Sequence, residues 1–188
     1  MSGSGSLSRR RLLGVSGAAG AAAVVAGCGL IPPVQSPVSR IPLRVTGSDV
    51  PLLDALLQSE YHAAYAYTAS VPRLNRYGVR LARWFLHQEL GHITVLYSLI
   101  RSGHAKPSAP LSSYPIGHPR DQRELLGELH VVEALSLATY SHAIPRLSSG
   151  KLRAIAASIM ANRAQHVSLL RLALGMEPVP SALATGSE

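Results

Sequence analysis

Two histidines of this 188-residue chain stand in similar surroundings but differ in the residue three positions before them. In "FLHQELGHITVL", His92 follows Glu89, whereas in "MANRAQHVSLL", His166 follows Arg163. A carboxylate and an imidazole three residues apart lie side by side on one face of a helix, where both can bind the same metal ion. A guanidinium cannot do so because it has no acceptor atom. Whether the chain holds a metal therefore depends on residue 163.

Both histidines belong to an internal repeat. Glu60 is followed by Tyr67 after seven residues and by "PRL" after twelve, and Glu133 is followed by Tyr140 and a second "PRL" at the same distances. The two histidines come 20 and 21 residues after the prolines of these triplets. The pattern indicates an internal duplication, so we expect the two halves to be related by approximate two-fold symmetry.

Three glutamates fall on the apolar faces of the predicted helices. At about 100° per residue, Glu60, Glu89 and Glu133 each share a face with leucines and aromatic residues. Burying a carboxylate without a partner is costly, so three converging ones require protons or a cation. The sequence therefore predicts a buried cation, either a metal ion or a basic side chain.

The elements that must position these groups are four helices. Apolar periodicity and turn signals predict them over about residues 49–70, 75–102, 121–145 and 149–174. Ser48 or Asp49 is expected to cap the first, which Pro51 starts well. Residues 104–119 contain four prolines and cannot be helical. We predict an all-α fold of two helix hairpins joined by a long crossover, with a simple up-down bundle as the alternative.

This pattern resembles the ferritin-like superfamily, and within it the small ferritin-like lipoproteins of the actinobacterial type. The resemblance covers about residues 48–177 and implies a ferritin-like four-helix bundle. In its di-iron members two helices each supply a glutamate and the other two each supply Glu-x-x-His. The metal ligands that it implies here are Glu60, Glu89, His92, Glu133 and His166, with Arg163 in the place of the last glutamate.

Two interpretations of Arg163 stay open. Its guanidinium suits bidentate binding to the inward carboxylates and would then replace the metal, leaving a degenerate site with no cofactor. The chain would be a binding or structural protein of the cell envelope with an unknown ligand. Alternatively, Arg163 points to solvent and iron or manganese is bound. The chain would then be a metal-dependent oxidoreductase or an iron-handling protein, so whether it is an enzyme is open and no catalytic residue is assigned.

Three further residues are expected around this site. His130 lies one turn before Glu133 and is expected either to orient that carboxylate, to substitute as a ligand or to be an ordinary core histidine. Tyr67 and Tyr140 are expected to contribute hydroxyl groups to the network or to seal the ends of the bundle as core tyrosines.

The N-terminal residues predict export and lipidation. Residues 7–28, "LSRRRLLGVSGAAGAAAVVAGC", combine three arginines, a weakly apolar run and the only cysteine of the chain. "SRRRLLG" resembles a twin-arginine export signal, and "VAGC" resembles the lipobox of bacterial lipoproteins. We predict a signal peptide over 1–27, a lipidated Cys28 with a proline-rich tether over 28–47, a domain over 48–177 and a flexible tail over 178–188. The expected location is the extracytoplasmic face of the cell membrane, reached through the lipid anchor.

Charge and motifs exclude several function classes. The formal net charge is +8, and removal of Arg9, Arg10 and Arg11 with the signal lowers Lys plus Arg from 18 to 15 against 10 acidic residues. The excess of basic residues is spread along the helices, so nucleic acid is not an expected partner. A weak attraction to anionic lipid is expected. No nucleophile elbow or nucleotide-binding loop is present. A homodimer through exposed helix faces is open, and no protein partner is indicated.

Overall fold

Four long helices account for most of the residues that this computed structural model describes, which are 43–183, 185 and 186. No strand occurs among them, so the all-α prediction is confirmed. The predicted signal peptide, Cys28 and most of the tether lie outside the described residues. The helices are α2 (Val50–Ser70), α3 (Arg76–Ser102), α4 (Gln122–Ala143) and α5 (Gly150–Ala173).

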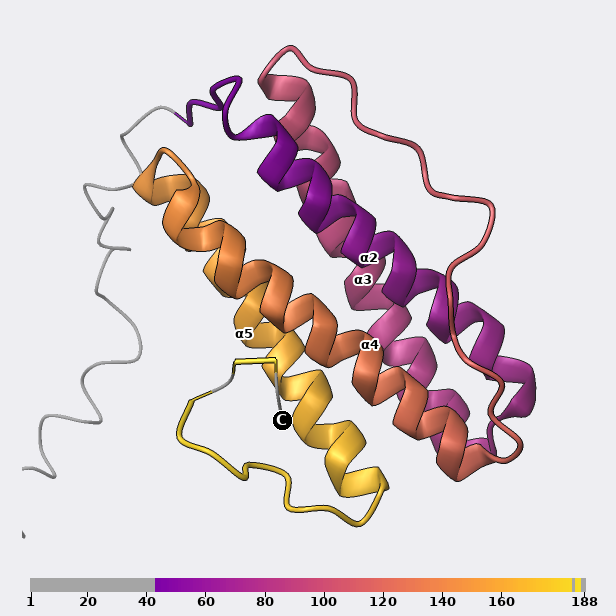
Figure 1. Ribbon diagram of the computed structural model, residues 1–188. Helices are drawn as coiled ribbons and strands as arrows, with labels where there is room; N and C mark the ends of the chain where they lie inside the picture. The colour runs from indigo at the N-terminus through magenta and orange to yellow at the C-terminus, as the bar shows by residue number, and fades with distance from the viewer. Residues whose placement is uncertain (1–42, 184, 187–188) are drawn as a thin grey trace, which may run out of the picture. The chain divides into compact units, whose positions relative to one another are not determined.

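The helices form two hairpins. α2 packs against α3 and α4 packs against α5, and a short 3-10 turn follows the first helix of each hairpin, at Val71–Arg73 and Ile144–Arg146. α2 also packs against α4, which brings the hairpins together. Residues 103–121 run back along α2, so α3 and α4 point in the same direction (Figure 1). This connection confirms the long crossover and excludes the simple up-down bundle.

Hydrogen bonds fasten the crossover to the outer face of α2. The Asp54 carboxylate accepts from the Ser108 backbone N–H at 2.9 Å and from its hydroxyl at 2.5 Å. The Tyr114 hydroxyl donates to Gln58 Oε1 at 3.0 Å, and its ring stacks on His62 with centroids 5.3 Å apart. These contacts give a connection without helix or strand a defined course along the bundle.

Short side chains begin three of the helices. Asn75, Asp121 and Ser149 each accept a hydrogen bond from the backbone N–H three residues later, at 2.9, 2.8 and 3.1 Å. α4 ends at Ala143, two residues earlier than predicted. Pro145 has no N–H with which to continue the helical hydrogen bonds, and the chain tightens into the 3-10 turn Ile144–Arg146, which contains it.

The expected cap of α2 by Ser48 or Asp49 is wrong, and the Ser48 hydroxyl pairs with the hydroxyl of Thr46. Asp49 has helical dihedral angles, φ −76° and ψ −29°, and its side chain makes no capping hydrogen bond, since a cap requires an extended backbone. Its buried carboxylate accepts instead from the backbone N–H and hydroxyl of Thr46 and from both groups of Ser148, at 2.7–2.8 Å. Burial alone would raise the pKa of Asp49, but these hydrogen bonds lower it. Asp49 thus joins the start of the first hairpin to the turn of the second.

Two apolar clusters fill the bundle, one on either side of a buried polar layer. On α2 the first cluster takes Leu53, Leu56 and Leu57, and the second takes Ala63, Ala66 and Tyr67, with the polar layer between them. The other helices divide in the same way. All buried members of both clusters lie between residues 53 and 174, so the unit carries its own core. None of the helices in the described part of the chain is both long and apolar enough to span a membrane.

Candidate functional site

The polar layer of the bundle contains the charged residues singled out by the repeat. α2 contributes Glu60, α3 contributes Glu89, α4 contributes Glu133, and α5 contributes both Arg163 and His166. Each is buried, because apolar residues one and two helical turns away place the same face of each helix against its neighbours. Three carboxylates from three helices therefore converge within one bundle cross-section.

Arg163 lies at the centre of this layer and not at the surface. Its Nε and Nη2 donate to the two oxygens of Glu60 at 3.0 and 2.5 Å. Nη2 also donates to Glu89 Oε2 at 2.5 Å, and Nη1 donates to Glu133 Oε2 at 2.6 Å. One guanidinium thus binds all three carboxylates, with the bidentate fork on Glu60. The interpretation in which Arg163 points to solvent is contradicted by these contacts.

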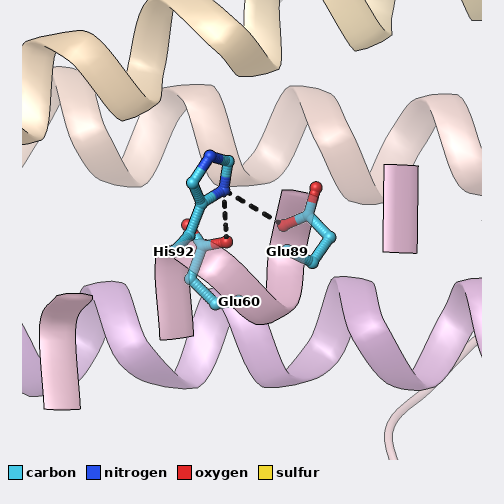
Figure 2. A group of neighbouring side chains, drawn as sticks. All are labelled: Glu60, Glu89 and His92. Atoms are coloured by element: carbon cyan, nitrogen blue, oxygen red, sulfur yellow. Dashed lines mark hydrogen bonds and ion pairs between the residues drawn. The ribbon is translucent and has the colours of Figure 1, made fainter. Parts of the chain in front are cut away.

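His92 closes the network on the side of α3. Its Nδ1 lies 3.2 Å from Glu60 Oε2 and 3.6 Å from Glu89 Oε2, as Figure 2 shows. The side chain of His92 is 13 % exposed, whereas both glutamates are fully buried. Among the charged members of the network, His92 is therefore the one that reaches water.

His166 occupies the corresponding position on α5. Its Nδ1 lies 3.0 Å from Glu133 Oε1 and 3.1 Å from Glu89 Oε1, and its Nε2 lies 2.5 Å from Gln88 Oε1. The imidazole stacks on Phe85, with ring centroids 4.0 Å apart. Because a single N–H serves two carboxylates, it bonds Glu133 and leaves Glu89 Oε1 as a buried oxygen without a hydrogen bond.

Gln88 and Phe85 are members of this site that the sequence analysis did not identify. Phe85 precedes Glu89 by four residues and so shares its helix face, which was a signal of proximity. Gln88 points about 100° away from Glu89 on an ideal helix. Only the position of α5 beside α3 shows that this direction leads to His166.

Two tyrosines complete the network by reaching across it. The Tyr140 hydroxyl of α4 donates to Glu60 Oε1 of α2 at 2.5 Å, and the Tyr67 hydroxyl of α2 donates to Glu133 Oε1 of α4 at 2.6 Å. The exchange is reciprocal, in agreement with the two-fold symmetry that the repeat predicts. His130 is buried on α4, but in the described part of the chain it is not among the side chains whose ligand atoms lie close enough together to hold a metal ion.

The pKa values of the network follow from burial opposed by ion pairs. Burial raises the pKa of Glu60 and of Glu133, but Arg163 and the surrounding hydrogen bonds outweigh it, so both values lie below the usual range. Burial together with the neighbouring charge of Glu133 raises the pKa of Glu89 to about 7, against the opposing effect of Arg163. Glu60 and Glu133 are therefore the permanently ionised carboxylates.

Both histidines of the network favour the protonated form. Burial lowers the pKa of His92, but hydrogen bonds to Glu60 and Glu89 raise it to about 9. Burial also lowers the pKa of His166, but its hydrogen bond to Glu133 and the negative charges of Glu133 and Glu89 raise it above the usual value. When the three glutamates, the two histidines and Arg163 are all ionised, Arg163 and two imidazolium ions face three carboxylates. The charges in the layer then balance without any additional cation.

A pair of metal ions does not fit this arrangement of donors. Two groups of ligand atoms within 4.8 Å of one another exist in the described part of the chain: Glu60, Glu89 and His92, and Glu89, Glu133 and His166. However, Arg163 occupies both oxygens of Glu60 and one oxygen each of Glu89 and Glu133, and each Nδ1 that faces them is paired with a carboxylate. A metal would have to displace the guanidinium and the histidine protons.

Comparison with protein families gives a match over most of the chain. The family described as "ferritin-like domain" matches residues 48–176. This range agrees with the limits that the helix pattern and the resemblance suggested. A search of curated proteins finds no match.

Solved structures with the same arrangement of helices include two bacterial proteins. One is described as "ferritin like, diiron-carboxylate proteins" from Bacillus anthracis str. Ames, with a TM-score of 0.60 and 20 % identity over 67 % of this chain and 94 % of that one. The other is a conserved hypothetical protein, rv2844, from Mycobacterium tuberculosis, with a TM-score of 0.65 and 14 % identity over 72 % and 96 % of the two chains. At these identities the similarity establishes the fold.

Proposed function

The chain belongs to the family of ferritin-like domains, and from this premise we propose that it is a lipid-anchored protein of the cell envelope whose di-metal centre has been replaced by a buried ion-pair network. In this proposal the domain serves in binding or in envelope structure and has no redox reaction of its own. Its four helices keep the family's arrangement, while the centre of the bundle is held together by side-chain charges.

The contact of one guanidinium with three carboxylates carries this proposal. Arg163 donates to Glu60, Glu89 and Glu133 from the position that the repeat makes equivalent to Glu89. A metal-dependent oxidoreductase needs a coordination position open to its substrate. Here each of the three carboxylates is bound by the guanidinium of Arg163, which is fully buried and covalently part of the chain. A permanent cation of this kind supports the bundle but offers no exchangeable site.

The proposed location rests on the N-terminal sequence. The arginine cluster, the apolar run and the sole cysteine stand in the order that export and lipidation require. In this proposal Cys28 carries the lipid, residues 29–47 are the tether, and the helical domain is held at the extracytoplasmic face of the membrane.

Iron or manganese binding is the second candidate function. It is favoured by the two Glu/His groups and by Glu89 Oε1, a buried oxygen without a hydrogen bond. The residues that would hold a metal are Glu60, Glu89, His92, Glu133 and His166. A metal there would supply Lewis-acid or redox chemistry, and Arg163 would have to withdraw from the layer.

Metal content distinguishes the two candidates. The chain from residue 29 onward is produced in medium rich in iron and manganese, and bound metal per chain is measured by mass spectrometry for the wild type, Arg163→Glu and Glu89→Ala. We expect no stoichiometric metal in the wild type and metal in Arg163→Glu, which restores the missing carboxylate. One or two metals per wild-type chain, lost in Glu89→Ala, would contradict the proposal and establish the second candidate.

Anchoring is tested separately in cells. The full chain is labelled with an alkyne fatty acid, and its membrane fraction is compared with that of Cys28→Ala. We expect labelled, membrane-bound wild type and an unlabelled Cys28→Ala protein. Equal labelling of both would show that Cys28 is not the lipidation site. Metal content and anchoring are independent measurements, so either part of the proposal can fail alone.

A further inference from the structure

The outer face of α3 is basic over its first three turns and again in its last turn. Four arginines and one histidine are exposed on it, within about 60° of one another on the helical wheel: Arg76, Arg80, Arg83, His87 and Arg101. The only acidic residue between positions 76 and 106 is Glu89, and its side chain is buried in the polar layer. No carboxylate on this helix therefore neutralises the exposed positive charge.

Large apolar and aromatic side chains flank this basic stripe. Tyr77 and Trp84, each 52 % exposed, lie along one edge together with Val95. Leu90 and Tyr97, which are 51 % and 46 % exposed, lie along the other edge. These five are among twelve large hydrophobic residues that are exposed in the described part of the chain. Their concentration beside one charged stripe is typical of a surface that meets another phase.

The chemistry of this face matches the interface of an anionic bilayer. Arginines attract phosphate headgroups, and tryptophan and tyrosine prefer the headgroup level, where the ring is in apolar surroundings and its polar atom is hydrated. The apolar face of α3 is buried in the bundle, so contact with such a surface would be made by the basic stripe and by the aromatic side chains beside it. A partner protein would have to present an equally long acidic strip between two apolar edges.

The last residues of the tether lie beside the C-terminal end of α3, which is compatible with such docking. Val45 packs at the C-terminal end of α3, since a Cβ at Gly103 would come within 2.7 Å of Val45 Cγ1. Residues 28–42 can extend to about 50 Å at most, at 3.3–3.6 Å per residue, and a helix of 27 residues is about 40 Å long. A lipid at Cys28 can thus sit in the bilayer on which α3 lies.

We propose that α3 docks the domain on the anionic membrane that anchors it, through the stripe Arg76, Arg80, Arg83, His87 and Arg101 and its aromatic edges. The inference deepens the proposed function, and it rests on the proposed lipid anchor for the identity of the surface. The attraction between α3 and anionic headgroups does not require the lipid, so it can be measured without it.

The position of Trp84 makes a direct experiment available, because it is the only tryptophan of the chain. The unlipidated chain from residue 29 onward, which contains the whole core, is mixed with vesicles of phosphatidylglycerol or of phosphatidylcholine. We expect co-sedimentation with the anionic vesicles only, weakened by salt, together with a blue shift of Trp84 emission and quenching by brominated lipid. Sedimentation without any change at Trp84 would show that another face binds and would overturn the inference.

Paired substitutions locate the contact. Arg80→Gln/Arg83→Gln is expected to weaken partitioning about 30-fold, at about fivefold for each arginine removed. The control Arg146→Gln/Arg153→Gln removes the same charge from exposed positions on the second hairpin and should leave partitioning within about threefold. Thermal melting of both variants establishes that they fold.

Equal weakening in the two double variants would mean that only net charge matters and would contradict docking through α3. Binding to phosphatidylcholine at equal strength would contradict it as well. If the chain is lipidated in cells but does not bind anionic vesicles, only the inference of docking through α3 is overturned. If the chain binds the vesicles through α3 but is not lipidated, the proposed lipid anchor is wrong and the proposed docking surface stands.

Discussion

Arg163 and Glu60 are joined by two parallel hydrogen bonds, from Nε to Oε1 at 3.0 Å and from Nη2 to Oε2 at 2.5 Å. The fork connects α5 of the second hairpin to α2 of the first, across the middle of the bundle. Both side chains are fully buried, so each depends on the other to offset the cost of leaving water. This pair places a fixed positive charge where a metal would otherwise balance the carboxylates.

Removal of Arg163 is expected to destabilise the domain strongly. Arg163→Ala should lower the free energy of unfolding by about 3 kcal/mol at pH 7, because it leaves Glu60, Glu89 and Glu133 buried with less compensation. Urea unfolding followed by circular dichroism measures this change. Arg163→Lys keeps the charge but loses the fork and should recover only part of the loss.

The loss in Arg163→Ala should also depend on pH. Arg163 holds the pKa of Glu60 below its usual 4.5, so its stabilisation is present above that value and is lost as the pH falls. Arg153→Ala, an exposed arginine on the same helix, is the control and should change stability by less than about 1 kcal/mol. A wild-type-like Arg163→Ala would contradict the central role of the guanidinium.

The reciprocal tyrosines should contribute through their hydroxyl groups. Tyr67→Phe and Tyr140→Phe each remove a hydrogen bond to a buried carboxylate, at a cost of about 1.5–3 kcal/mol. Tyr97→Phe, at an exposed position on α3, should be nearly neutral. Thermal melting of the three variants tests this. If removal of the whole ring lowers stability but the phenylalanine variants are as stable as the wild type, the tyrosines only fill the core.

His92 should make stability depend on pH in the neutral to alkaline range. Its pKa is raised from 6.5 to about 9 in the folded chain, so the stabilisation is complete below pH 6.5 and is lost as the pH rises through about 9. We expect His92→Gln to lower the free energy of unfolding by about 1–2 kcal/mol at pH 6 and by almost nothing above pH 9.5. The effect is reduced because the side chain of His92 is partly exposed. Unfolding free energies measured across this range check the slope. His87→Gln, on the exposed face of the same helix, should leave the wild-type profile unchanged.

Asp49 should act as a link between the two hairpins and not as a helix cap. Asp49→Asn is expected to destabilise the domain by about 2 kcal/mol at pH 7, because four hydrogen bonds to the carboxylate are weakened or lost. The pKa of Asp49 is lowered from 3.8, so the difference from the wild type should shrink as the pH falls below that value. Additive effects of Asp49→Asn and Ser148→Ala in a double-mutant cycle would show that the two residues are not coupled.

The number, length and type of the helices could be predicted from the sequence, because these features depend on local properties. Apolar periodicity places the four helices, prolines exclude helix from the crossover, and the repeat indicates which residues of the two hairpins correspond. The same periodicity puts Glu60, Glu89 and Glu133 on inward faces. Periodicity did not settle the cap of α2, because the carboxylate of Asp49 finds partners in a turn 99 residues away.

The orientation and the partners of the Arg163 side chain could not be predicted and are known only from the packing of the helices. A long, flexible side chain on a helix can turn inward or outward, and the choice depends on which groups the neighbouring helices bring within its reach. Here three helices bring carboxylates within 2.5–2.6 Å of its terminal nitrogens, so every nitrogen of the inward guanidinium has a hydrogen-bond partner. The reciprocal hydroxyls of Tyr67 and Tyr140 and the contact between Gln88 and His166 depend in the same way on the packing of helices that are distant in sequence.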